Sequence, residues 1–168
     1  QAWNAGGDAL IIQDTGLLEL DLPPLPLIAS TQMHNMDADH ILFLEHVGFQ
    51  RVILSRELSL DEIIAIRRQT SIELESFVHG ALCVSHSGRC YLSAALGGRS
   101  ANRGECGQPC RLPWTLIDAE GNVLERSRHL LSLKDMDRSN HLAELMDAGV
   151  TSFKIEGRLK DEAYVKNV

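Results

Sequence analysis

The sequence predicts an α/β protein whose strands form a parallel sheet or barrel. Short apolar segments alternate with amphipathic helical segments at intervals of roughly 20 residues, which is typical of repeated strand–helix units. One interval departs from this spacing, because about 50 residues separate Val78 from Leu130 and all four cysteines of the chain lie between them. The chain has 168 residues, enough for one domain with a buried core.

Six segments have the composition of buried strands, being short and rich in branched and apolar residues. They occupy residues 8–14, 25–32, 51–57, 71–78, 129–135 and 151–157. A TIM barrel has eight such units in ~250 residues, so we expect a partial (β/α)8 barrel of about six units. An open doubly wound sheet is the alternative, but no glycine-rich phosphate-binding loop follows any strand to favour it.

The two ends of the chain suggest a part of a longer protein. The sequence starts at Gln1 rather than at a methionine, and it stops at Val168 within a helical pattern. We therefore expect residues 1–168 to be a truncated barrel domain. Its uncovered strand edges would favour dimer formation.

Helical segments lie between the predicted strands. They cover residues 37–46, 59–69 and 140–148, and a last helix is expected to start near Asp161. The second helix begins with a capping box, in which Ser59 and Glu62 cap each other's backbone. The third ends at Gly149, a residue that readily adopts the left-handed conformation of a helix end.

The long interval is predicted to be an insertion after the fourth strand. Its first part, residues 79–112, is rich in cysteine, glycine and arginine and shows no helix or strand pattern past Val84. Its second part, residues 113–127, predicts a β-hairpin with a turn at Asp118–Asn122.

The spacing of the cysteines is C-x6-C-x15-C-x3-C, formed by Cys83, Cys90, Cys106 and Cys110. Without a secretory signal, four thiols favour a metal site or catalysis over disulfides. Zinc ribbons use paired C-x2–4-C motifs, of which only the last two cysteines qualify, whereas iron–sulfur loops tolerate irregular spacing. The residues leave zinc and iron–sulfur undecided, with reduced core cysteines, disulfides or a nucleophilic thiol as weaker alternatives. His79 and His86 are possible substitute ligands.

Charged residues within the strands form a second group of candidates. Glu75 and Lys154 precede apolar residues in their strands, and burying either without a partner is costly. Lys154 and Glu156 share one face of a strand by the two-residue period. We expect these three residues either to form structural ion pairs or to contact a substrate at the carboxyl ends of the strands, where barrel active sites form.

The charge of the chain is unevenly distributed. Its net charge is 16 − 23 = −7, which argues weakly against nucleic acid as a partner. Residues 89–111, however, contain four arginines against one acid, Glu105, and form a local basic patch. The arginines are candidates for binding phosphate groups, namely Arg89, Arg99, Arg103 and Arg111. No signal peptide and no apolar run of membrane-spanning length is visible, so a cytoplasmic protein is expected.

One segment resembles a known family. The pattern E-x-F-x-x-G-A-L-C-x4-G-x-C-x-L-S, from Glu75 to Ser93, is similar to the motif of the U32 "peptidase" or collagenase-like family, and residues 98–114 resemble a further block of it. The likeness is strongest to the branch that hydroxylates a cytidine of 23S ribosomal RNA, through residues 19–32 and 54–63. The resemblance implies an RNA-modifying enzyme with a [4Fe–4S] cluster, whose ligands would be Cys83, Cys90, Cys106 and Cys110.

The peptidase function in the family name has little support in the residues themselves. The sequence contains no G-x-S-x-G elbow and no H-E-x-x-H motif. A cysteine protease would leave three of the four thiols without a role. We therefore expect a hydroxylase of ribosomal RNA or its precursor, in which Glu75, Lys154 and Glu156 orient the base or a small co-substrate. A peptidase is the alternative, followed by a non-catalytic RNA-binding protein with a structural metal site.

Overall fold

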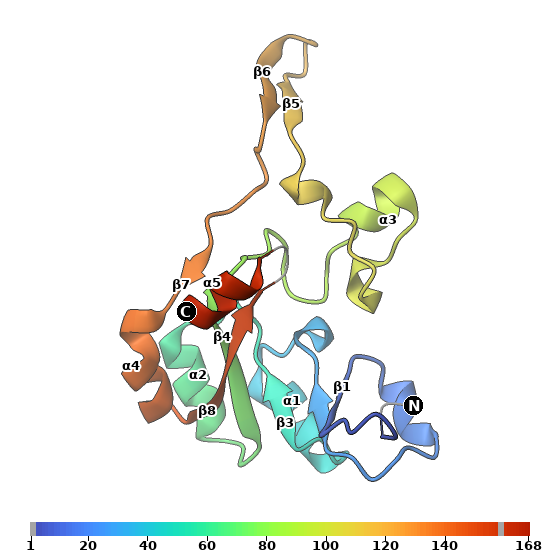
Figure 1. Ribbon diagram of the computed structural model, residues 1–168, viewed down its shortest axis with the longest axis vertical. Coiled ribbons are helices and arrows are strands. Elements are labelled where there is room, and N and C mark those ends of the chain that lie inside the picture. Colours follow the sequence, from blue (N-terminus) through green and yellow to red (C-terminus); the bar gives the residue numbers. More distant parts are fainter. Residues whose placement is uncertain (1–2, 158–159) are drawn as a thin grey trace.

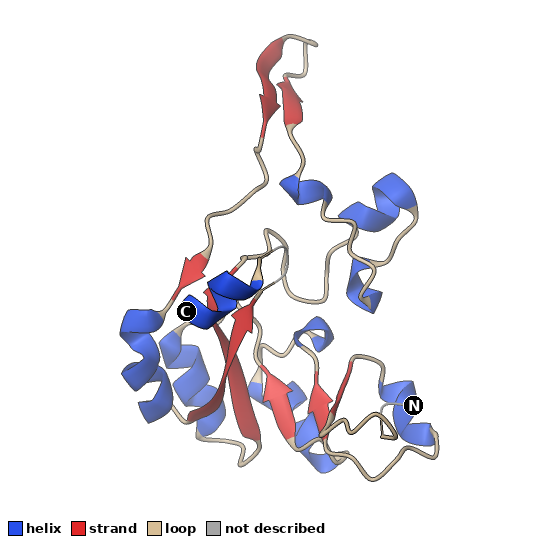
Figure 2. Ribbon diagram, viewed as in Figure 1, coloured by secondary structure: helices blue, strands red, loops and turns tan. Residues whose placement is uncertain are grey.

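The computed structural model describes residues 3–157 and 160–168, which form a mixed α/β structure around a mostly parallel sheet (Figures 1 and 2). Its five parallel strands pair in chain order: β1 (Leu10–Ile12), β2 (Leu27–Ala29), β3 (Arg51–Ile53), β4 (Glu73–Gly80) and β8 (Val150–Glu156). This order is the one that a barrel requires, and no reversal of order, as in a doubly wound sheet, occurs among the described strands. Within the described residues the sheet is open, with β1 and β8 at its edges.

The fifth predicted strand is wrong. Residues 129–135 form a turn and irregular backbone, and Leu130, Leu131 and Leu133 remain exposed, so this apolar run does not enter the sheet. The strand that follows, β7 (Met136–Asp137), is short and runs antiparallel to β4. It shares one edge of β4 with β3, because β8 occupies the other edge. The mostly parallel sheet is therefore confirmed, whereas a closed TIM barrel and dimer formation through its edges stay predictions.

The predicted helices are present within a few residues of their expected bounds. They are α1 (Ala38–His46), α2 (Leu60–Arg67), α4 (Leu142–Asp147) and α5 (Glu162–Asn167). The capping box of α2 forms as expected, with the Ser59 side chain accepting from the Glu62 amide and the Glu62 carboxylate accepting from the Ser59 amide. None of the described helices is long and apolar enough to cross a membrane.

Two layers of apolar side chains flank the sheet. On one face, strand residues such as Val52 and Leu74 pack against Leu44 of α1, Ile63 of α2 and Leu145 of α4, and all five are buried. Alternate residues of the strands point to the other face, where a smaller cluster is formed by Ile28, Ile53 and Phe77. This second face leads to the candidate site, because Phe77 of its cluster lines the cavity described below.

The insertion and hairpin leave the sheet after β4, as predicted. The hairpin pairs β5 (Trp114–Ile117) with β6 (Val123–Arg128) and projects away from the body (Figure 1). Asp118 fixes its turn, since one carboxylate oxygen accepts from the amides of Glu120 and Asn122 at 3.1 and 2.7 Å. The other short elements are η1 (Thr15–Glu19), η2 (Thr31–Met33), α3 (Leu92–Gly97), η3 (Ala101–Arg103), η4 (Pro109–Arg111) and η5 (Ser139–His141).

Candidate functional site

The cysteine-bearing insertion, residues 81–111, lies across the carboxyl ends of the parallel strands (Figure 1). Its start requires a glycine, because Gly80 has a φ of 108° and a Cβ there would stand 2.2 Å from the Glu156 carbonyl oxygen. The insertion contains the short helix α3, so the expectation of no regular structure past Val84 is wrong at this point. Its sequence signal is weak, since α3 has no side-chain cap and exposes most of its residues.

A segment between the first two cysteines anchors the insertion to the sheet. Ser87 is fully buried, and the Glu57 carboxylate accepts hydrogen bonds from its amide and, at 3.0 Å, from its hydroxyl. His34 Nδ1 donates to the Ser87 carbonyl at 2.8 Å. Gly88 has a φ of 74°, and a Cβ on it would stand 2.1 Å from the Gln32 carbonyl oxygen. These contacts hold the segment around Ser87 against the ends of β2 and β3. At Gly88 they leave no room for a larger residue.

Hydrogen bonds within the insertion position the other cysteines. Asn102 Oδ1 accepts from the Cys90 amide at 3.1 Å. Ser93 Oγ accepts from the Gly107 amide at 2.9 Å, next to Cys106. These bonds join parts of the insertion more than ten residues apart, so that the last two cysteines fold back toward the second.

Arg111 joins the two ends of the insertion. Its guanidinium donates to the Leu82 carbonyl at 2.6 Å, to Ser132 Oγ at 2.9 Å and to the Leu133 carbonyl at 3.2 Å. Leu82 and Arg111 are the sequence neighbours of the first and last cysteines, Cys83 and Cys110. The hydrogen bond from Arg111 to Leu82 therefore brings together two cysteines that are 27 positions apart in the sequence (110 − 83).

All four cysteines line one cavity of about 470 Å³, which we call the thiol cavity. The ends of the strands supply its opposite wall, through Thr31, Gln32, Arg56, Phe77 and Glu156. The cysteines are half-buried free thiols. Burial raises the pKa of the Cys110 thiol, and the nearby thiols of Cys83 and Cys106 raise it further, while Arg111 opposes them.

The chemistry of the four thiols fits a metal group held by thiolates. Among the described residues, no three Cys, His, Asp or Glu side chains are placed to hold one metal ion. A four-iron cluster takes one thiolate on each iron, so its ligands surround a volume instead of meeting at one atom. Four thiols around a common cavity suit that arrangement of ligands.

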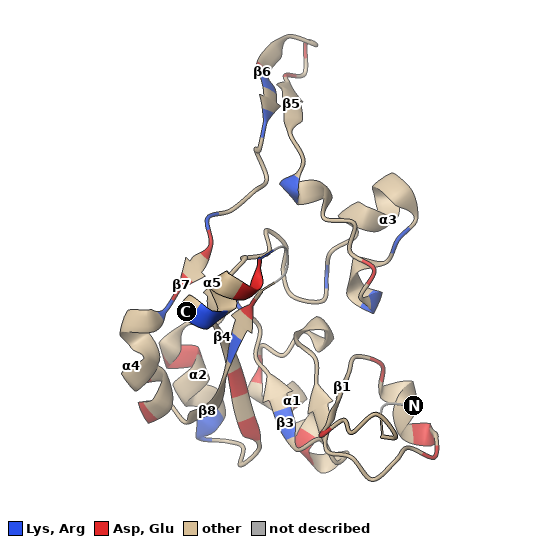
Figure 3. Cartoon of the chain, in the orientation of Figure 1, with Lys and Arg blue, Asp and Glu red and all other residues tan. Residues whose placement is uncertain are grey.

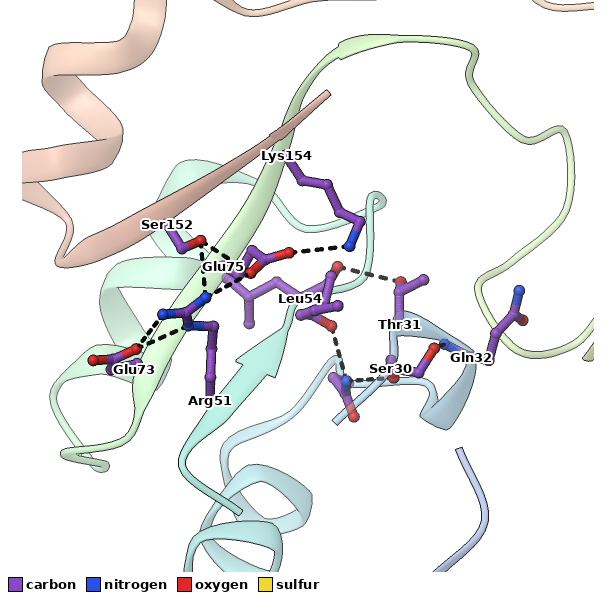
Figure 4. Close-up of polar contacts among 11 residues, drawn as sticks. Ser30, Thr31, Gln32, Arg51, Leu54, Glu73, Glu75, Ser152 and Lys154 are labelled. Atoms are coloured by element: carbon purple, nitrogen blue, oxygen red, sulfur yellow. Dashed lines mark hydrogen bonds and ion pairs between the residues drawn. The ribbon is translucent and has the colours of Figure 1, made fainter. Parts of the chain in front are cut away.

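The three charged strand residues separate into two groups, because Glu75 and Lys154 pair with each other (Figure 4), whereas Glu156 lines the thiol cavity. Glu75 is buried and accepts from Ser152 Oγ at 2.9 Å and from Arg51 and Lys154, each at 3.3 Å. Lys154 thus pairs with Glu75, which differs from the expected pair with Glu156. The catalytic role predicted for these residues stays a prediction, and only Glu156 of the three lines the thiol cavity.

The predicted phosphate-binding arginines also differ in their surroundings. Arg111 is half-buried and its donors are taken up by neutral oxygens of the chain. Arg89, Arg99 and Arg103 are exposed on the insertion, whose basic residues appear in blue in Figure 3. The structure gives these three side chains no hydrogen bond or ion pair with another described residue. Their role in RNA binding stays a prediction.

The sequence places polar residues of the sheet side of the cavity at the ends of predicted strands, but this alone did not single them out as site residues. Gln32 and Arg56 lie three residues beyond the ends of β2 and β3, and polar residues in such positions are also common in turns without function. From the sequence alone, Phe77 cannot be distinguished from an ordinary core residue of β4. The available signal was their shared position after parallel strands, where binding sites form.

These features define an α/β protein with a cysteine-lined cavity at the carboxyl ends of a parallel sheet. The model of peptidase family U32 matches residues 1–168, and the chain belongs to that family. The chain is 55% identical to the 23S rRNA 5-hydroxycytidine C2501 synthase of Escherichia coli strain K12, over 99% of this chain and 25% of that protein.

Two further relatives carry different descriptions. An uncharacterized protease of Methanocaldococcus jannaschii is 44% identical over 94% of this chain and 41% of its own length. The tRNA hydroxylation protein P of Helicobacter pylori is 34% identical over 94% of this chain and 40% of its own length. The chain therefore spans between a quarter and about two fifths of these relatives.

Proposed function

We propose that this chain carries the cluster-binding part of an RNA hydroxylase, with a [4Fe–4S] cluster held by Cys83, Cys90, Cys106 and Cys110. The observation that supports this most directly is the convergence of all four thiols on one cavity whose other wall is the end of a parallel sheet. A cluster bound there would supply electron transfer, which amino-acid side chains do not provide. The target would be a cytidine of ribosomal RNA in the cytoplasm, as the name of the relative from Escherichia coli suggests.

The chain's own residues would bind and orient the substrate. Glu156 and Arg56 lie in the thiol cavity, where they can hold polar groups of the substrate close to the thiols. Glu75 and Lys154 sit behind this wall, and Lys154 Nζ lies 5.9 Å from the centre of the Phe77 ring, so they would keep the wall rigid. Arg89, Arg99 and Arg103 would contact phosphates outside the cavity. The sheet would be part of a barrel that closes in the full-length protein.

The cluster is tested by preparing the protein without oxygen and measuring iron, sulfide and visible absorption. We expect about four irons and four sulfides per chain and a sharp loss of both in Cys106→Ser. Ser85→Ala, a change in the same insertion, should leave them unaltered. Colourless protein loaded with zinc would refute the iron–sulfur cluster and retain a metal site, whereas protein without any metal would refute both.

The hydroxylase activity is tested in cells that lack the gene. Mass spectrometry of ribosomal RNA nucleosides should show the loss of a cytidine that is heavier by one oxygen atom. The wild-type gene should restore this nucleoside, and the Cys106→Ser gene should not. An unchanged nucleoside profile in the deletion strain would contradict the proposal.

Peptidase activity is the second candidate, because a relative is described as a protease. The adjacent residues His86 and Ser87 do lie near one acid, Glu57. The Ser87 hydroxyl, however, is fully buried and bonds to the Glu57 carboxylate, and a serine nucleophile needs to be accessible and bonded to a histidine. Cleavage of gelatin by the purified protein, lost in Ser87→Ala, would favour the peptidase.

A further inference from the structure

A second hollow continues the thiol cavity along the ends of the strands. This hollow measures about 490 Å³ and lies between the end of β1 and η3. It shares Ser30, Gln32 and Gly104 with the thiol cavity. The two spaces are therefore neighbours that share part of their wall, and we call them together the groove. Arg56 lies in its first part and Arg103 in its second.

Arg56 is held in a fixed orientation within the groove. Its guanidinium carbon lies over the Phe77 ring, 5.4 Å from the ring centre, and Phe77 is itself buried. Arg138 donates to the Arg56 carbonyl at 3.2 Å and so fixes the backbone. A guanidinium stacked on a ring keeps its N–H edge free for a ligand, and that edge matches the paired oxygens of a phosphate.

In the described part of the chain, the ion pairs next to the groove involve cations other than Arg56. Lys160 forms an ion pair with Asp135, and Lys154 forms one with Glu75. Arg56 has neither an ion pair nor a side-chain hydrogen bond with any described residue. A half-buried guanidinium with unused donors makes this part of the groove favourable for an anionic group.

We propose that the groove is a track for single-stranded RNA, in which Arg56 binds the phosphate of the nucleotide whose base enters the thiol cavity. Arg103 then binds a neighbouring phosphate in the second hollow. The nature of the ligand rests on the proposed function, and a single strand is required because chemistry on a base needs that base to be unstacked. The volume of the thiol cavity is in the range of small-ligand sites.

The track is tested by the salt dependence of RNA binding. The probe is a labelled single-stranded RNA with one cytidine among uridines, and its dissociation constant is measured by fluorescence anisotropy at several KCl concentrations. Each phosphate contact on a single strand contributes about 0.7 to the slope of log K against log salt. Arg56→Gln and Arg103→Gln should each reduce the slope by about that amount. Arg68→Gln removes an exposed arginine outside the groove and should leave the slope unchanged.

Arg56→Lys provides a second variant that preserves the charge. It should keep the wild-type slope while weakening binding several-fold, because an ammonium lacks the paired donors of a guanidinium. A wild-type slope in Arg56→Gln, or a reduced slope in Arg56→Lys, would overturn the track. If RNA is oxidised normally but Arg56→Gln keeps its slope, only the track fails. If the slope falls as expected but no cytidine is oxidised, the proposed function fails and the track stands.

Discussion

The sheet and the cysteine-bearing insertion are stabilised in different ways. The sheet and its helices bury a continuous apolar cluster that includes Val52, Leu74 and Leu145. The insertion, residues 81–111, contributes only two small buried apolar residues, Ala101 and Pro109. Its shape depends instead on hydrogen bonds and on close backbone contacts with the strand ends. The comparison indicates that the sheet folds through apolar burial, whereas the insertion needs its polar anchors and, in our proposal, its cluster.

The largest difference is expected from shortening one leucine in each region. Leu74→Ala removes a side chain with 0% exposure from the sheet and should reduce the free energy of unfolding by about 3 kcal/mol. Leu96→Ala removes a side chain of α3 that is 56% exposed and should change it by less than about 0.5 kcal/mol. Urea unfolding followed by circular dichroism measures both, and equal losses would refute the distinction between the regions.

Substitutions at two glycines of the insertion distinguish the effect of backbone strain from the effect of losing contact with the sheet. Gly88 and Gly104 have similar positive φ angles, 74° and 86°, so an alanine at either carries a left-handed penalty of about 1–2 kcal/mol. A Cβ at Gly104 meets open space, but at Gly88 it would collide with the Gln32 carbonyl. Gly88→Ala should therefore detach residues 81–91 from the sheet, whereas Gly104→Ala should not.

Hydrogen exchange of residues 81–91, measured by mass spectrometry, reports this release. We expect faster exchange in Gly88→Ala and exchange close to wild type in Gly104→Ala, with the sheet protected in both. Similar exchange in the two variants would show that the contact with Gln32 does not hold the insertion.

The sequence predicts the sheet better than the insertion because the sheet follows local patterns. Branched residues in 51–57 and 71–78 mark buried strands, and Ser59 with Glu62 marks the start of α2. The segment 129–135 has a similar composition and was predicted wrongly. Composition alone does not show whether leucines such as Leu131 find a partner surface.

The insertion follows contacts between distant residues, which no local pattern reveals. Spacing could indicate that the four cysteines share a site, but it could not show that Glu57 binds Ser87, 30 positions further along the chain. Equally, the two-residue period placed Lys154 and Glu156 on one face of a strand and so suggested an ion pair between them. The structure pairs Lys154 with Glu75, because β8 lies beside β4 and brings the two strands' side chains together. The pairing of strands β4 and β8 therefore determines the ion-pair partner of Lys154, and the residue spacing within β8 does not.

A smaller effect is expected from the carboxylate that anchors the insertion. Glu57→Gln removes the charge that strengthens the bonds to the Ser87 amide and hydroxyl, and it should weaken local protection of residues 81–91 by about 1–2 kcal/mol. Glu105→Gln is the matched control, since Glu105 is exposed in the same insertion and its side chain has no hydrogen bond with a described residue. Hydrogen exchange distinguishes the two, and equal protection in both variants would mean that Glu57 is dispensable for the anchor.

The smallest effect concerns a carboxylate of the sheet region and depends on pH. Hydrogen bonds from Ser71 and Thr70 hold the pKa of Glu45 below its ordinary value. Because the pKa is lower in the folded state, this group stabilises the protein fully above its unfolded-state pKa, and the contribution is lost as the pH falls through the folded-state pKa. Glu45→Gln should therefore lower the unfolding temperature at neutral pH and approach wild type in acid. Glu19→Gln, at an exposed glutamate without a side-chain partner among the described residues, should follow wild type throughout. A constant offset between Glu45→Gln and wild type at every pH would show that these hydrogen bonds stabilise the fold regardless of the charge. The contact would then resemble the hydrogen bonds between neutral groups within the insertion.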